Sequence, residues 1–228
     1  IHKREVVLGK GDGSLKDARP IMNDGEEATP LFRAALRALK HLLPAGGCCC
    51  CCGGGGGPSP QFARWSLILD EEIGFKQCVI WDKGPMGMGW HYRRSYECVL
   101  VGEKPGAACR WFDTSNKIEN IIRPTKGTKK IIPSANDHPT VKPVAVSSHF
   151  IGLHTAPGHV VLDPFMGSGS TLVSCAKMGR KGIGIELDPQ WFDLACKRVE
   201  EAYRQPDLFQ EAPAPVAHQI SLFGGEND

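Results

Sequence analysis

The chain has 228 residues, of which 41% are hydrophobic and 23% charged, so its composition is that of a globular protein and excludes an intrinsically disordered chain. It contains no apolar run of membrane-spanning length and no signal-peptide pattern, which argues against a membrane partner and favours a cytoplasmic protein. The formal net charge of +2 is too small to indicate a nucleic-acid partner by itself.

The first half of the chain shows helical and strand patterns in turn. Residues 1–28 are polar and Gly-rich, which predicts a loop. Apolar residues then recur at helical spacing over 31–42, and Thr29 and Pro30 stand where an N-cap and a first helical residue are expected. The next patterns predict a strand over 48–52, a loop over 53–60, a helix over 61–73, and strands over 75–81 and 95–102.

Residues 107–137 have no sustained period, and regular patterns return after them. They predict a helix over 143–155, a strand over 159–163, a helix over 170–179, a strand over 182–186 and a helix over 189–204. This alternation predicts an α/β fold with a mostly parallel sheet and helices on both faces. After Arg204 the chain is rich in proline and acidic residues and is interpreted as a flexible tail.

Ten cysteines are present, and five of them form the run 48–52. Adjacent cysteines on an extended strand point to opposite faces, so the run cannot surround one zinc ion. We therefore expect no metal site, and we interpret the run as a buried strand whose cysteines act as small hydrophobes in a reducing compartment.

The stretch "DPFMGSGST" at 163–171 follows an apolar run and precedes a predicted helix. It lacks the lysine of a phosphate-binding P-loop and the third glycine of a dinucleotide fingerprint. Gly167 and Gly169 nevertheless let a ligand approach the backbone, and Glu186, 23 residues after Asp163, stands where ribose hydroxyls would be bound. The pattern favours a nucleoside-containing cofactor; an ordinary turn between a strand and a helix is the alternative.

Three segments in this order, "HPTVKP" (138–143), "VVLDPFMGSGST" (160–171) and "GIGIELDP" (182–189), resemble the S-adenosylmethionine-dependent DNA amino-methyltransferases of bacteria and phages in their permuted β-type order. The resemblance covers roughly residues 20–204. It implies a Rossmann-like α/β fold, S-adenosylmethionine as cofactor, and methylation of adenine N6 or cytosine N4 in double-stranded DNA. The implied organisation is a catalytic-half remainder (1–106), a target-recognition insert (107–137), a cofactor-binding half (138–204) and a tail (205–228).

In the loop, the resemblance implies that Asp163 and the backbone of 167–171 hold the methionine part of the cofactor. Phe165 would pack against the apolar surface of the cofactor. The cofactor-binding residues predicted in this loop are Asp163, Pro164, Phe165, Gly167, Gly169, Ser170 and Thr171.

Outside the loop, the resemblance implies that Glu186 accepts hydrogen bonds from the ribose hydroxyls and that Asp188 lies close to the adenosine end. Thr140 and Lys142 would bring donors to the carboxylate of the cofactor. For Lys142 the alternative is a solvated lysine at the start of a helix.

The catalytic [D/N/S]-P-P-[Y/F/W] motif of the family, which binds the exocyclic amine of a flipped base, is absent from the sequence. The nearest match, "DPQW" at 188–191, follows the wrong strand, and its proline suits the first turn of a helix. We expect the motif upstream of Ile1, so that this chain is truncated and binds its cofactor weakly. A catalytically inactive DNA- or clamp-binding remnant is the alternative.

Basic residues gather in the predicted insert, where 115–142 has six basic and two acidic side chains. We interpret it as the region that positions DNA; a solvated loop is the alternative. Together with "HPTVKP" it argues against a small-molecule methyltransferase or dehydrogenase on the same fold. The predicted DNA-binding residues are Arg93, Arg94, Arg123, Lys126, Lys129 and Lys130.

The tail contains two similar pentapeptides, "QPDLF" at Gln205–Phe209 and "QISLF" at Gln219–Phe223. Both resemble the short peptides by which bacterial replication proteins dock on the sliding clamp. They predict the clamp as a partner; the alternative is that Leu208 and Phe209 pack back on the domain.

Overall fold

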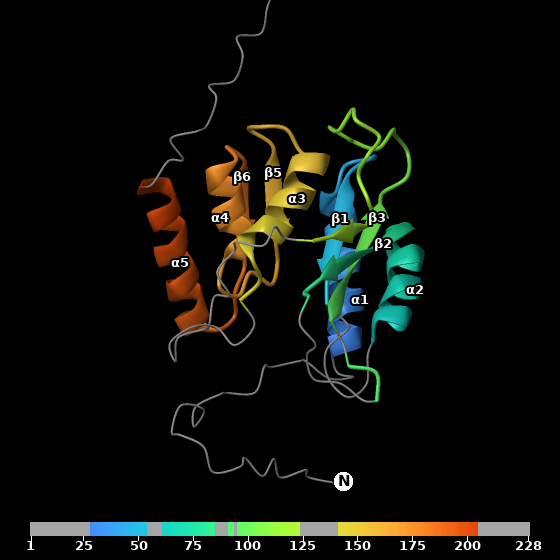
Figure 1. Cartoon of the computed structure of the whole chain (residues 1–228), viewed down its shortest axis with the longest axis horizontal. Coiled ribbons are helices and arrows are strands. Elements are labelled where there is room, and N and C mark those ends of the chain that lie inside the picture. The colour runs from blue at the N-terminus through green and yellow to red at the C-terminus, as the bar shows by residue number, and fades with distance from the viewer. Residues whose placement is uncertain (1–27, 54–60, 85–90, 94, 124–140, 205–228) are drawn as a thin grey trace, which may run out of the picture.

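A computed structural model describes residues 28–53, 61–84, 91–93, 95–123 and 141–204. Two groups of elements lie side by side in Figure 1, with helix α3 (Val144–His154) between them. One group contains strands β1 to β4 with α1 and α2, and the other contains β5 and β6 with α4 and α5. None of the helices in these residues has the length and apolar character that crossing a bilayer requires.

The larger sheet has the order β1-β3-β2-β4. Its strands are β1 (Cys48–Cys52), β2 (Phe75–Asp82), β3 (Tyr96–Glu103) and β4 (Ile121–Ile122). Strand β3 runs antiparallel to both β1 and β2, whereas β4 pairs with β2 in parallel. Strand β3 lies between β1 and β2. Its apolar run 98–101 is buried throughout, as expected of a strand covered on both faces.

Helices α1 (Ala28–Leu42) and α2 (Phe62–Glu72) cover one face of this sheet. Their core contains Leu36, Leu69 and Leu100, and the rings of Phe32 and Trp65 stack with centroids 4.3 Å apart. Buried apolar area of this kind is the main stabilising contribution to folding.

The predicted cap at the start of α1 is wrong. Thr29 lies inside the helix, and its hydroxyl accepts a hydrogen bond from Trp65 Nε1 at 3.0 Å and donates one to Gln61 Oε1 at 3.3 Å. Tertiary contact between α1 and α2 therefore fixes this hydroxyl, in place of the local capping expected from the sequence.

Helix α3 covers the opposite face. Val146 and Phe150 pack with Val99, Val101 and other apolar residues of that face, Trp81 and Ile122. Because side chains alternate along a strand, Leu100 points to α1 and α2 while its two neighbours point to α3.

The smaller sheet is a parallel pair, β5 (Val160–Asp163) and β6 (Lys181–Gly184), joined through α4 (Ser170–Lys177). Helix α5 (Pro189–Arg204) follows and packs against α4. Ser174, fully buried on α4, donates a hydrogen bond to the carbonyl of Val144 at 3.0 Å. Helix α3 thus contacts both the larger sheet and α4.

The predicted α/β, Rossmann-like class with helices on both faces is confirmed. The parallel arrangement holds for β2–β4 and β5–β6, but β3 is antiparallel to its neighbours, so the larger sheet is mixed. The cysteine strand exists, yet it lies at the edge of its sheet and none of its residues is buried, contrary to the prediction. The predicted insert contributes the short strand β4. The predicted boundaries stay predictions, and the tail lies outside the described residues.

Candidate cofactor site

The loop from Asp163 to Ser170 connects the carboxyl end of β5 to α4, and backbone hydrogen bonds tie it to the chain after β6. Ile185 N donates to the carbonyl of Asp163 at 2.9 Å, and Met166 N donates to the carbonyl of Ile185 at 3.0 Å. All seven residues predicted here lie on this turn or in the first turn of α4: Asp163, Pro164, Phe165, Gly167, Gly169, Ser170 and Thr171. Ligands of open α/β sheets bind at such carboxyl ends.

Glu186 braces this loop. Its Oε2 accepts a hydrogen bond from Gly167 N at 2.9 Å, and its Oε1 accepts from the backbone N–H groups of Leu187 and Asp188 at 2.9 Å each. Hydrogen bonds to a carboxylate are shorter and stronger than neutral ones. Glu186, which the sequence predicts to contact the ribose, therefore also fixes the conformation of the loop.

Gly167 and Gly169 have φ angles of 49° and 77°, a region that favours glycine. A Cβ on Gly169 would lie 2.8 Å from the Cβ of Ala195 on α5. The sequence suggested that this glycine leaves room for a ligand, but the structure gives a packing reason, because Ala195 fills the space. Gly184 at the end of β6 is similar, since a Cβ there would lie 2.3 Å from Met166 Sδ.

Phe165 and Asp163 form the part of the loop that faces outward. Phe165 is 56% exposed, which is unusual for a large apolar residue in a folded protein. Its backbone N–H donates to Asp163 Oδ1 at 3.1 Å, so the carboxylate lies against the backbone of the loop. An exposed ring and a carboxylate on the same short turn fit a ligand with both an apolar body and polar groups.

Asp188 has a structural role of its own. Its Oδ1 accepts from Gln190 N at 2.8 Å, and its carbonyl accepts from Phe192 N at 3.0 Å, so it caps the start of α5. This geometry agrees with the view that the "DPQW" stretch starts a helix.

Ser170 and Lys142 are joined by a hydrogen bond in which Ser170 Oγ donates to the Lys142 carbonyl at 2.8 Å. Ser170 is buried, so its hydroxyl is committed to the chain that enters α3. Thr140 lies outside the described residues. Sequence reasoning missed Arg198, whose Nη1 contacts the carbonyl of Ser168 from α5 and lies 3.5 Å from Ser170 Oγ. Arg198 lies three residues after Ala195, which also contacts the loop, and only the structure shows that this face of α5 meets it.

The electrostatics of Cys52 link this loop to the larger sheet. The pKa of this thiol is raised to about 11, chiefly by desolvation, although the residue keeps exposed surface. Lys142 lowers the pKa, while Glu97 and Asp163 raise it. The charges of the loop residue Asp163 and of Lys142 therefore act on this edge strand of the larger sheet.

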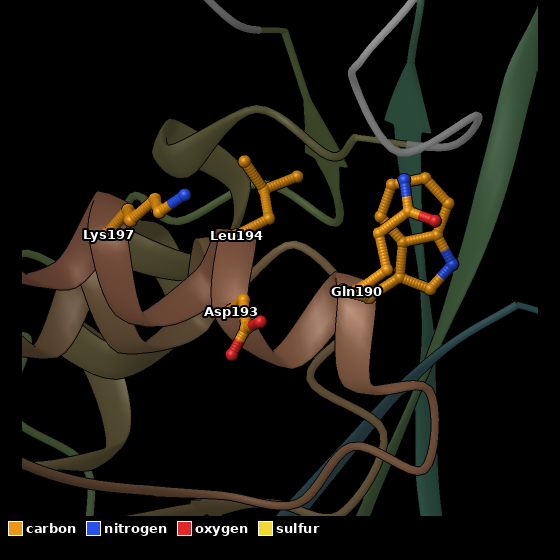
Figure 2. A pocket seen from close by; sticks show the side chains of 5 residues that line it. Gln190, Asp193, Leu194 and Lys197 are labelled. Atoms are coloured by element: carbon orange, nitrogen blue, oxygen red, sulfur yellow. The ribbon is translucent and has the colours of Figure 1, made fainter.

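A separate hollow of about 280 Å³ runs along α5 (Figure 2). It is lined by Gln190, Trp191, Asp193, Leu194 and Lys197. None of the residues predicted to bind the cofactor lines it, so the loop and this hollow are distinct features.

The predicted DNA-binding residues are placed only in part. Arg123 follows β4 with a largely exposed side chain, and it pairs with Glu119 at 3.1 Å and Asp82 at 3.7 Å. Arg93 is described near the start of β3. The others lie outside the described residues: Arg94, Lys126, Lys129 and Lys130.

A protein-family model described as DNA methylase matches residues 22–197. The chain belongs to this DNA methylase family. The suspected relationship to the N6/N4 amino-methyltransferases is thereby confirmed.

Among curated relatives, type II methyltransferase M2.DpnII of Streptococcus pneumoniae is 41% identical over 73 residues, covering 32% of this chain and 27% of the relative. Type II methyltransferase M.BglI of Bacillus subtilis is 35% identical over 135 residues, covering 54% of this chain and 38% of the relative. The chain therefore matches less than two fifths of the length of either relative.

Among solved structures, the M1.HpyAVI–SAM complex is 27% identical, with a TM-score of 0.62 over 77% of this chain and 84% of that one. PvuII DNA methyltransferase, described as cytosine-N4-specific, is 17% identical, with a TM-score of 0.65 over 82% of each chain. The second similarity shows the fold alone.

Proposed function

We propose that this chain is part of an S-adenosylmethionine-dependent methyltransferase that modifies the exocyclic amine of adenine (N6) or cytosine (N4) in double-stranded DNA. The observation that carries the proposal is the loop braced by Glu186 at the carboxyl ends of two parallel strands, in a chain that belongs to the DNA methylase family. A similar chain has been solved as the M1.HpyAVI–SAM complex.

The residues of the loop fit this cofactor. When bound, it would supply an electrophilic methyl group: the amine nitrogen forms the new bond as the sulfur–methyl bond breaks, a neutral thioether leaves, and the amine loses one proton to solvent. Phe165 offers an exposed ring for its apolar surface, and Asp163 offers a carboxylate for its ammonium group. Glu186 orients the turn through Gly167 and accepts from the ribose hydroxyls, while Lys142 and Thr140 serve the cofactor carboxylate.

DNA is held, in this proposal, by the basic residues Arg93, Arg94, Arg123, Lys126, Lys129 and Lys130, and the target base is flipped out of the helix. Glu119 and Asp82 already pair with Arg123, so a phosphate competes with them for this guanidinium. Such contacts make affinity fall steeply with salt. We propose that the protein acts in the cytoplasm, where bacterial DNA lies.

The tail supports a second, separate interaction. We propose that Gln205–Phe209 and Gln219–Phe223 dock on the bacterial sliding clamp through their leucine and phenylalanine side chains. A tail peptide that fails to bind purified clamp at high micromolar concentration removes this proposal and leaves the methyltransferase proposal unchanged.

The test of the main proposal is calorimetric titration of S-adenosylmethionine into the full-length protein and its Glu186→Gln variant. The amide keeps the shape but presents N–H groups to backbone donors, and a hydrogen bond to a charged group contributes about 1.5–3 kcal/mol. Affinity should therefore fall at least about tenfold. Glu200→Gln on the exposed side of α5, where Glu200 pairs only at the surface with Arg204, is the matched control and should bind normally.

Transfer of labelled methyl groups to DNA by the full-length protein completes the test. Cofactor binding that is equal in both variants would overturn the role of Glu186. Cofactor binding without methylation of DNA would instead favour the inactive remnant, and absence of both would overturn the proposed function itself.

A further inference from the structure

Two cysteines and a histidine from separate parts of the chain lie close together. Cys48 begins β1, Cys109 follows β3, and His154 is the last residue of α3. The two Sγ atoms lie 3.3 Å apart, and they and a ring nitrogen of His154 all lie within 4.8 Å of one another. We propose that these three side chains bind one zinc ion.

The fold brings the three residues together although Cys48 and Cys109 are 61 positions apart. Cys49 and Cys51 pack against the core of α1 and α2, so strand alternation places Cys48 on the face that α3 covers. The segment after β3 then passes between β1 and α3. Arg110 N donates to the carbonyl of Gly46 at 3.3 Å, and Phe112 N donates to the carbonyl of Leu153 at 2.8 Å.

These backbone bonds hold each ligand close to its neighbour. The bond to Gly46 lies two residues before Cys48, and the bond to Leu153 lies one residue before His154. The site is thus built on the ends of a strand and a helix, joined by hydrogen-bonded backbone.

The surroundings of His154 favour a ligand at this place. Its Nδ1 atom is buried and has no hydrogen-bond partner among the described residues, although the ring also interacts with the backbone of Arg110. Coordination by the ring is one way to satisfy a buried imidazole. The ring of Trp111 packs edge-on against His154, with centroids 5.2 Å apart, which restricts its orientation.

The charge nearby also favours a cation. Glu103 stands directly opposite Cys48 in the β1–β3 register, so both side chains project from the same face. Its carboxylate is only partly exposed and lies 3.8 Å from the Nζ of Lys76. A partly buried carboxylate beside two thiols lowers the electrostatic energy of a bound divalent ion.

The donor set indicates the kind of metal. Thiolate and imidazole ligands select zinc over the hard cations magnesium and calcium. Two sulfurs that are each about 2.3 Å from a tetrahedral zinc lie about 3.7 Å apart, so the observed 3.3 Å requires a shift of only a few tenths of an ångström. Binding displaces both thiol protons to solvent, and the fourth position is left for water.

Zinc at this place would join the segment after β3 to the end of α3. The other end of α3 is held to α4 by Ser170 and Ser174. The metal would therefore stabilise the connection between the larger sheet and the cofactor half. This inference is independent of methyl transfer and would stand if the proposed function failed.

The test uses protein purified under reducing conditions, freed of metal with a chelator, and titrated with Co²⁺ and then Zn²⁺. We expect one equivalent to bind, with a thiolate-to-cobalt charge-transfer band that zinc abolishes. Cys109→Ser and His154→Ala should each weaken binding by more than about 10–100-fold, the loss that follows removal of an outer-shell partner. Cys50→Ser, an exposed cysteine on the same strand, is the matched control and should bind as the unaltered protein does.

Circular dichroism checks that the variants are folded, and the cobalt spectrum of the unaltered protein needs no variant at all. The proposal is overturned if the reduced protein binds no stoichiometric metal or shows no charge-transfer band. It is equally overturned if folded Cys109→Ser binds as tightly as Cys50→Ser, because the ligands would then lie elsewhere.

Discussion

Replacing Gly169 by alanine tests the packing between the loop and α5. The residue has a φ angle of 77°, and the new Cβ would lie 2.8 Å from the Cβ and 3.2 Å from the Cα of Ala195. Ala195 is 1% exposed, so it has little room to move. The substitution therefore combines backbone strain with steric overlap against a backbone atom.

The two contributions can be separated within this chain. A non-glycine residue held in the left-handed region costs about 1–3 kcal/mol, and overpacking a core costs about 1–3 kcal/mol more. Gly158 provides the matched control, because its φ angle is 82° and a Cβ there meets nothing within 4 Å. We expect Gly158→Ala to lower the free energy of unfolding by the strain alone and Gly169→Ala by about 1–3 kcal/mol beyond that.

The assay is urea denaturation followed by circular dichroism, on both single variants and on the pair Gly169→Ala with Ala195→Gly. Removing the Ala195 side chain costs about 1 kcal/mol in a helix of the unaltered protein. In the Gly169→Ala background it should cost less, because it also relieves the overlap. Equal losses for Gly158→Ala and Gly169→Ala, or strictly additive effects in the pair, would refute the packing argument.

Three further predictions concern other contacts. Ser174→Ala removes the buried hydroxyl that bonds α4 to α3 and should lower the free energy of unfolding by about 1 kcal/mol, measured by urea denaturation. Desolvation raises the pKa of Glu72, but hydrogen bonds from Arg33 and Arg37 outweigh desolvation and leave the pKa below its usual 4.5. The stability that ionised Glu72 contributes is therefore fully present above pH 4.5 and is lost as the pH falls through the lowered pKa. Unfolding measured between about pH 6 and pH 3 should show a shallower acid loss in Arg33→Ala than in the parent protein, and identical profiles would contradict the assignment. Phe165→Ala should leave the free energy of unfolding unchanged, since its ring is 56% exposed, while weakening S-adenosylmethionine binding in calorimetry; unchanged binding would exclude the ring from the site.

Some features of this protein are readable from the sequence because they depend on residues close together in the chain. The helix, strand and loop patterns from 143 to 204 predict α3, β5, α4, β6 and α5 within a few residues. The three linked motifs likewise identify the family. Hydrophobic periodicity and turn residues act locally, so a linear pattern is enough to find them.

Other features were decided only by tertiary structure. The cysteine run had the composition of a buried strand but lies at a sheet edge, because burial depends on which strands pair. Position 169 has no room for a larger side chain because Ala195 of α5, 26 residues later in the chain, packs against it. The expectation of no metal site rested on spacing within one run, whereas the three residues that we propose as zinc ligands lie far apart in the chain, at the start of β1, after β3 and at the end of α3. Contacts between distant residues depend on how elements pack in space, and the order of residues along the chain does not record that packing.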